Sequence, residues 1–183
     1  MSQPRILPVE PPYESETAHE LEKIMPPGIE PLKLFRTLAH NPRILRKFRR
    51  SNLLDRGSID RRDREIVILR TCARCGAEYE WGVHVVFFAA RFGITEEQVE
   101  ATVNGTAAHP CWPEKEALLI RLVDELHDVA RISDDLWLAL SANWQPSQLI
   151  ELIVLAGFYH TVSFVINGAR VELEEGTPRF PPP

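Results

Sequence analysis

One stretch of the sequence places an acid and an imidazole where they can share a proton. Glu80 and His84 stand four residues apart in a segment that is otherwise mostly apolar. On a helix, side chains at i and i+4 meet on one face. If that face is enclosed, the carboxylate favours the charged ring while burial opposes it, and the pair exchanges protons near neutral pH. The same spacing also fits a plain surface pair, worth a few tenths of a kcal/mol.

A second acid, Glu65, lies among the apolar residues 66–69 on the preceding predicted helix. An acid in such a place can join a proton-transfer site, because a neighbouring carboxylate tunes the charge of an imidazole. The alternative is that Glu65 extends the charged first turn of its helix. Both interpretations stay open at this point.

Cys72 and Cys75 have the Cys-x-x-Cys spacing of redox sites. We place them at the C-terminus of a helix, where the partial negative charge disfavours a thiolate. Free cysteines are commonly small buried apolar residues, so a redox role is the alternative rather than the leading interpretation. With Cys111 the chain has three cysteines, an odd number, and we expect no disulfide framework.

The elements that carry these residues are predicted to be helices. Apolar residues recur at intervals of three and four from Leu32 to Glu174, without a convincing alternating run, so we expect an all-α, compact multi-helix bundle. Asn41 with Pro42, Asp60, the Thr95/Gln98 pair and Ser133 are predicted helix starts. The predicted helices are 31–40, 42–54, 61–75, 77–92, 96–104, 113–130, 134–143 and 146–173, with a short helix within 15–25. Glycines 57, 76, 93 and 105 are candidate stops.

The last predicted helix is apolar on nearly every side through Phe164, so it should be the central helix, buried all round or shared with another subunit. Prolines concentrate at both ends of the chain, where they favour extended arms that lie on the body or on a neighbouring subunit. The predicted organisation is a Pro-rich N-terminal arm (1–31), a helical domain (32–174) and a Pro-rich tail (175–183).

Composition narrows the classes of partner. The 183 residues carry 21 basic and 26 acidic side chains, a net charge of −5, which argues against a nucleic-acid surface. No uninterrupted apolar run reaches the ~18 residues of a membrane span, and residues 1–31 lack the pattern of a secretory signal. We therefore expect a cytoplasmic protein without a membrane or nucleic-acid partner.

The stretch around His84 resembles the carboxymuconolactone decarboxylase and alkyl hydroperoxidase D superfamily, over about residues 32–173. In the hydroperoxidase branch a glutamate is followed by Cys-x-x-Cys-x-x-x-His. Counting from Glu65 puts that pattern on Ala77, Glu80 and His84, so both thiols are missing there. The chain is more similar to a branch with Glu-Tyr-Glu-Trp-x-x-His, here residues 78–84, and with Gly-Phe-Tyr-His, here residues 157–160, followed by an asparagine, here Asn167.

The resemblance implies an alkyl hydroperoxidase D-like bundle that forms homo-oligomers, and a cofactor-free lyase acting on a small organic acid or lactone. In that scheme His84 is the general acid or base, Glu80 orients it, and Glu65 relays protons or tunes the charge of His84. Tyr79, Trp81 and His160 would line the substrate pocket.

Two alternatives remain: a thiol peroxidase that uses Cys72 and Cys75, or a non-catalytic helical scaffold. A metal held by Glu65, Glu80, His84 and His160 is a minority hypothesis, because a second Glu-x-x-His pair is missing. We therefore expect no metal. His127, in a charged context, is assigned no role.

Overall fold

The computed structural model describes residues 3–25, 28–51 and 53–182, and within these residues it contains helices and no strand. In chain order the α-helices are α1 (Ser15–Leu21), α2 (Lys33–Leu38), α3 (Pro42–Arg50), α4 (Arg61–Arg74), α5 (Glu78–His84), α6 (Glu96–Asn104), α7 (Glu114–Val129), α8 (Asp134–Asn143) and α9 (Pro146–Ala169). A π-helical segment η1 (Val85–Ala89) and a 3₁₀ turn η2 (Ala90–Phe92) follow α5 directly. The predicted all-α class is confirmed.

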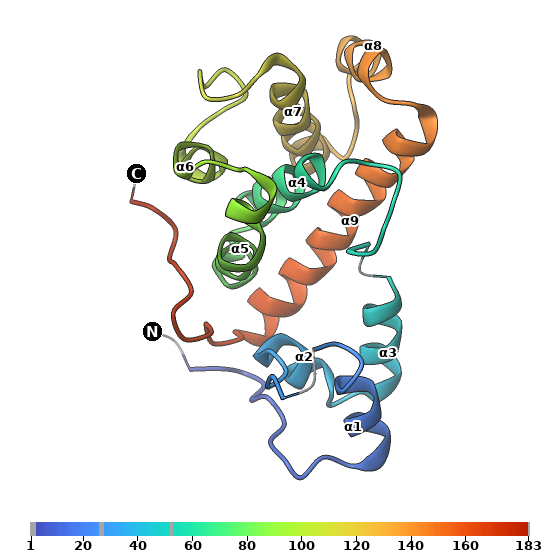
Figure 1. Ribbon diagram of the computed structural model, residues 1–183, viewed down its shortest axis with the longest axis vertical. Helices are drawn as coiled ribbons and strands as arrows, with labels where there is room; N and C mark the ends of the chain where they lie inside the picture. Colours follow the sequence, from blue (N-terminus) through green and yellow to red (C-terminus); the bar gives the residue numbers. More distant parts are fainter. Residues whose placement is uncertain (1–2, 26–27, 52, 183) are drawn as a thin grey trace.

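Helix α4 is the centre of the bundle. Ten consecutive residues of this helix, 63–72, are buried, and it packs against α5, α6, α7 and α9 (Figure 1). The last helix, predicted to be central and either buried all round or shared with another subunit, packs on α4 but is not buried all round within the chain. On α9 the side chains of Ile150, Val154 and Phe164 are exposed, because the chain's own helices cover only one side of it. The part of the prediction that concerns a second subunit stays a prediction.

By length and composition alone, α9 could cross a membrane, and it is the one such helix in the described residues. Its other side, however, packs on α4, α5 and α8 through nine buried residues, as the core helix of a soluble fold does. A single long apolar helix is weak evidence for a membrane span, because the core helices of soluble proteins have the same length and composition.

Several helix ends follow from local side-chain chemistry, as predicted. Asn41 accepts a hydrogen bond from the amide of Ile44, Asp60 accepts one from the amide of Arg62, and Thr95 forms a full capping box with its partner three residues on. After α4 the chain passes through Gly76 with φ +63, a left-handed conformation that glycine adopts without strain.

Three predicted helices differ from the structure. The helix expected at 42–54 ends at Arg50, well before the candidate stop Gly57. The segment 77–92 stays helical, but its pitch changes after His84, where the π segment η1 begins. The last helix ends at Ala169 rather than at 173, because Arg170 adopts a left-handed φ of +54 and the amide of Val171 turns back to the carbonyl of Ile166. The π segment matters for the site, since such insertions re-aim the side chains next to them.

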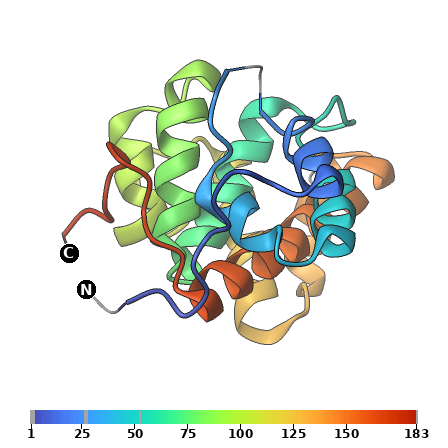
Figure 2. The same cartoon turned by 90° about the horizontal axis from the view of Figure 1, so that it is seen from below.

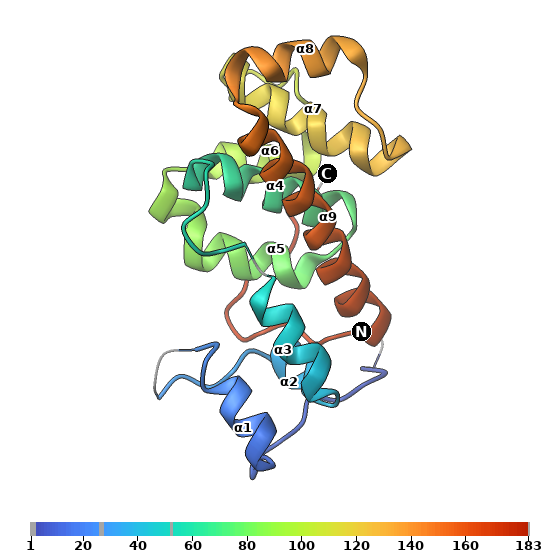
Figure 3. The same cartoon turned by 90° about the vertical axis from the view of Figure 1, so that its right-hand side faces the viewer.

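Both arms lie on the body of their own chain: in the first arm the amides of Arg5 and Val9 donate to the carbonyls of Ala169 and Arg36, and the tail runs beside α5 (Figures 1 and 2). The tail crosses α5: the ring of Phe180 contacts Trp81 at 5.3 Å between centroids, and its amide donates to Glu78. Gly82 makes this possible, since a Cβ there would come within 2.7 Å of the Pro178 carbonyl oxygen. At the other end, α1 and α2 pack on α3, away from α7 and α8 (Figure 3).

Candidate active site

The imidazole of His84 lies at the end of α5, with only 2% of the residue exposed. Its Nδ1 is 2.6 Å from Oε2 of Glu65, which projects from the central helix α4 and is fully buried. A bond this short between a ring nitrogen and a carboxylate is typical of a charge-assisted pair. The structure therefore joins two of the predicted residues, Glu65 and His84, inside the bundle.

The other ring nitrogen of His84 faces two oxygen groups. Nε2 lies 3.1 Å from the hydroxyl of Tyr159 on α9 and 3.5 Å from Oε1 of Glu80, one turn earlier on α5. Glu80 is itself buried, but with 8% of its surface exposed it is the member of this group closest to solvent. We call Glu65, Glu80, His84 and Tyr159 the buried network.

The charges of the buried network decide the state of the ring. Burial opposes a charged imidazole, but the nearby carboxylates of Glu65 and Glu80 outweigh it and raise the pKa of His84 to about 9. At neutral pH the ring is thus an imidazolium that donates from Nδ1 to Glu65 and from Nε2 toward Tyr159 and Glu80. Burial, followed by the same two carboxylates, raises the pKa of Tyr159 well above its usual value, so its hydroxyl stays neutral.

The two acids lie at opposite edges of the His84 ring. Glu65, expected to relay protons or to tune the charge of the ring, accepts a hydrogen bond from Nδ1 and helps to raise the pKa of His84. Glu80, expected to orient the ring, faces Nε2 on the side nearer to solvent. Glu65 faces Nδ1 because α4 lies against that edge of the ring. This arrangement depends on how the helices pack and not on the spacing along one helix.

An aromatic and cationic layer covers the buried network on the side of the π segment. Phe88 lies 5.0 Å from the ring of His84 and stacks on Phe92 at 6.0 Å. Arg64 is buried, donates from Nε to Glu65 at 3.3 Å, and places its guanidinium 5.7 Å from the Phe92 ring. Arg64 and Phe92 thus separate the buried network from the outside.

Outside this layer lies a surface cleft of about 640 Å³, walled in part by Arg64 and Phe92 themselves. Five arginines line it: Arg56, Arg61, Arg62, Arg64 and Arg91. Three acids, Asp55, Asp60 and Glu151, line it as well. Arg62 is paired with Glu116 and Arg64 with Glu65, which leaves Arg56, Arg61 and Arg91 as the candidates to bind a small anion such as a carboxylate, which arginine binds with two parallel hydrogen bonds.

The residues predicted to line the substrate pocket do not gather at the imidazole. The hydroxyl of Tyr79 donates to Glu174 at 2.6 Å, and Nε1 of Trp81 donates to Thr102 at 2.9 Å, on other sides of α5. His160 faces His127, so a metal site that joins it to Glu65, Glu80 and His84 does not form. Helical geometry explains the first two, because neighbours of Glu80 on one helix must point away from its face.

The sequence interpretation missed Tyr159 and Arg64. Tyr159 lies inside the Gly-Phe-Tyr-His stretch, where the histidine, rather than the tyrosine, was taken as the site residue. Arg64 directly precedes Glu65, and its contact with that acid comes from a bent side chain that spacing does not reveal. A tyrosine amid an apolar helix was the available signal, since a buried phenol needs a hydrogen-bond partner.

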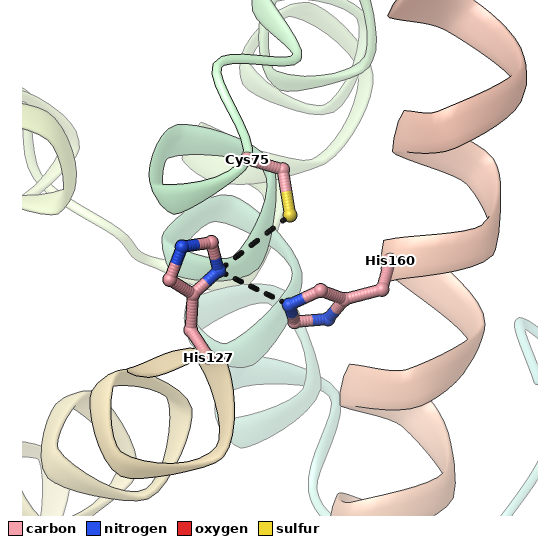
Figure 4. Close-up of side chains that lie close together, drawn as sticks. All are labelled: Cys75, His127 and His160. Carbon is pink, nitrogen blue, oxygen red and sulfur yellow. Dashed lines mark hydrogen bonds between the residues drawn. The ribbon is translucent and has the colours of Figure 1, made fainter. Parts of the chain in front are cut away.

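The cysteines occupy different environments, and all three are free thiols. Cys72 is fully buried in α4, where burial above all, and then the charge of Glu80, raise its pKa well above the usual value. Cys75, at the C-terminal cap of α4, is partly exposed, and its sulfur lies 3.8 Å from Nδ1 of His127 (Figure 4). Cys75, His127 and His160 together form a second cluster of polar side chains.

Comparison with known proteins gives one family. Residues 41–124, which include Glu65, Glu80 and His84, match the sequence profile of the Carboxymuconolactone decarboxylase family. No curated protein matches the chain in sequence.

Solved structures share the fold at low identity. A peroxidase-related protein of uncharacterised function from Silicibacter sp. superposes with a TM-score of 0.80 at 14% identity, covering 99% of this chain and all of the other. An alkylhydroperoxidase AhpD core protein from Ralstonia eutropha gives 0.70 at 12% identity, covering 95% of each chain. A protein of unknown function from Agrobacterium tumefaciens, linked by its description to the antioxidant defence protein AhpD, gives 0.59 at 20%, covering 64% of this chain and 80% of the other.

Proposed function

We propose, on the premise that this chain belongs to the carboxymuconolactone decarboxylase and AhpD-like superfamily, that it is an acid–base enzyme of the lyase type. The family covers decarboxylase and peroxidase-related proteins in general. We propose the decarboxylase side for this chain, with a small organic acid or lactone as substrate, in the cytoplasm.

The observation that carries this proposal is the buried imidazole of His84, held between the carboxylates of Glu65 and Glu80. A carboxylated lactone that loses carbon dioxide breaks a carbon–carbon bond and leaves the electron pair on an enolate-like carbon, which must then take up a proton. His84 supplies that proton from Nε2, and its positive charge stabilises the developing enolate. Glu80, the member nearest to solvent, returns a proton to the ring, while Glu65 keeps the ring oriented. No cofactor is needed at this site.

The arginine-lined cleft supplies the substrate in this proposal. A carboxylate bound there lies beside Arg64 and Phe92, which form the layer over the buried network. We propose that the side chains of Phe88 and Phe92 rotate when substrate binds and open a path to Nε2. A bound substrate that fills this path would exclude water from the His84 ring and so strengthen the electrostatic interactions there.

Decarboxylation of a panel of carboxylated lactones tests the proposal. We expect His84→Asn to remove turnover, and His19→Asn, on the partly exposed α1, to leave it unchanged. Circular dichroism and thermal unfolding check that both variants fold. Because the panel could omit the true substrate, NMR titration of the histidine ring protons gives a second readout: a ring that titrates near pH 9 in the wild-type protein supports the network, and one near 6.5 contradicts it.

A second candidate function, thiol peroxidase, rests on Cys75, which is partly exposed and whose sulfur lies 3.8 Å from Nδ1 of His127. Its place at a helix C-terminus disfavours the thiolate. Peroxide consumption that disappears in Cys75→Ser would support this function. The lyase proposal predicts that the same variant keeps decarboxylase activity.

We also propose that the chain forms a homo-oligomer through α9, whose exposed side carries Ile150, Val154 and Phe164 at helical spacing. Covering such a row is the usual fate of an apolar helix face. Light scattering of the wild-type protein and of Phe164→Glu tests it, and a monomeric wild-type protein contradicts it.

A further inference from the structure

Three side chains from three helices converge on one point at the surface of the bundle. Cys75 comes from the end of α4, His127 from the last turn of α7 and His160 from the middle of α9 (Figure 4). Nδ1 of His127 lies 3.8 Å from the sulfur and 3.1 Å from Nε2 of His160, and all three atoms lie within 4.8 Å of one another. We call these residues the Cys–His–His cluster.

The orientation of His160 is fixed from behind. Its Nδ1 lies 2.8 Å from the carbonyl oxygen of Ala156, one turn earlier on α9. A carbonyl only accepts, so Nδ1 carries the proton and Nε2 presents its lone pair to the cluster. Histidines that bind metals are oriented in this way by a hydrogen bond from the other ring nitrogen. Asn167 fixes a second member, because its amide donates to the carbonyl of Cys75 at 2.8 Å.

From this geometry we propose that the Cys–His–His cluster binds one Zn²⁺ ion, with a fourth position open to solvent. One thiolate and two imidazoles are a ligand set that zinc favours. Around a tetrahedral zinc, with bonds of about 2.3 Å to sulfur and about 2.0 Å to nitrogen, the ligand atoms lie roughly 3.3–3.6 Å apart. The separations of 3.1 and 3.8 Å bracket this range, so small side-chain shifts suffice.

Proton balance for zinc binding is simple. Without metal, the short contact between the two rings needs one shared proton, which Nδ1 of His127 donates to Nε2 of His160. When zinc binds, the proton on Nδ1 of His127 is replaced by one on Nε2 of the same ring, so this imidazole stays neutral. The thiol of Cys75 loses its proton to solvent. One proton is therefore released for each zinc ion bound. All three residues are partly exposed, so the ion, a water molecule at the fourth position or a small anion can reach the site.

This proposal is separate from the function proposed for His84. Tyr159 and His160 are neighbours on α9, yet the first faces His84 and the second faces His127. Zinc at the Cys–His–His cluster would tie α4, α7 and α9 together without touching the buried network. It would also occupy the sulfur of Cys75, so the bound form could not act as a thiol peroxidase.

Titration of the full chain with Zn²⁺ and with Co²⁺ as a spectroscopic probe tests the proposal. We expect one ion per chain, a tetrahedral cobalt spectrum, and a thiolate-to-cobalt charge-transfer band that vanishes in Cys75→Ser. That variant should bind zinc roughly 100-fold or more weakly, since one of three ligands is lost. Cys111→Ser, at another partly exposed cysteine, is the matched control and should bind as the wild-type protein does.

Should Cys75→Ser fail to fold, His127→Gln serves instead, because it removes a ligand from a partly exposed position. Zinc should raise the unfolding temperature of the wild-type protein and leave that of His127→Gln unchanged. Absence of one-to-one binding in the wild-type protein, or equal affinity in the ligand variants and the Cys111→Ser control, overturns the proposal.

Discussion

The molecule holds two polar clusters that both draw residues from α4 and α9 but differ in burial and in charge. In the buried network the ring of His84 is enclosed, and its charge is compensated by Glu65 and Glu80. In the Cys–His–His cluster, two imidazoles and a thiol face one another at a partly exposed position. The environment of a histidine, more than its neighbours along the chain, thus decides whether it holds a proton tightly or presents a lone pair.

Removing Glu65 should break this contrast with the largest effect. Glu65→Leu leaves a buried ring with one less counter-charge and Arg64 without its acid, so we expect a loss of about 3–5 kcal/mol in the free energy of unfolding at pH 7. Urea unfolding measures it. Glu65→Gln, which keeps the shape and an accepting oxygen, should lose less.

The corresponding substitution in the Cys–His–His cluster is His127→Gln. Without metal it should cost under about 1 kcal/mol, because the side chain is partly exposed. Equal losses at Glu65 and His127 would mean that the two clusters do not differ in the way described.

The dependence of stability on pH should show the next largest effect. The pKa of His84 is raised to about 9 in the folded chain, against about 6.5 in the unfolded chain, so the folded state binds more protons between these values. The contribution is complete below pH 6.5 and is lost as pH rises through 9, by about 3 kcal/mol in all. Urea unfolding at pH 6, 7.5 and 9.5 measures it, relative to His84→Gln, in which this slope should be missing.

How much of this could be predicted depends on the range of the interaction. Glu80 and His84 share a helix face by spacing alone, and the caps at Asn41 and Thr95 are equally local, so the sequence was sufficient for them. The contact of His84 with Tyr159 spans 75 positions, and it depends on how α9 crosses α5.

The Cys–His–His cluster could not be foreseen for the same reason. His127 is 52 positions from Cys75 and 33 from His160, on a helix whose own pattern gives no sign of a site. Periodicity predicts which face of α7 is buried, but not which residue of α4 its last turn will meet. The pitch change after His84 was equally hidden, since the apolar residues 85–89 suit an α-helix as well as a π segment.

A smaller effect is expected at Arg64, the link between the buried network and the cleft. Arg64→Gln removes a charged donor to Glu65 and a hydrogen bond to the carbonyl of Leu54, so we expect about 2 kcal/mol of destabilisation. Loss of the positive charge should also lower the affinity of the cleft for a carboxylate substrate, seen as a higher KM. Zinc affinity should stay as in the wild-type protein, and a change there would contradict the separation of the two clusters.

The smallest expected effects come from substitutions at two neighbouring residues on α9, and comparing these variants tests whether the two clusters are independent. Tyr159→Phe removes only the hydroxyl 3.1 Å from Nε2 of His84, so we expect about 1 kcal/mol of destabilisation and a shifted pH profile of the His84 ring, with zinc affinity unchanged. His160→Asn should do the reverse, because its ring faces His127 and the sulfur of Cys75. NMR titration of His84 and zinc titration, applied to both variants, measure all four outcomes. If either variant changes both readouts, the clusters are coupled through α9, and each must then be treated as part of one site.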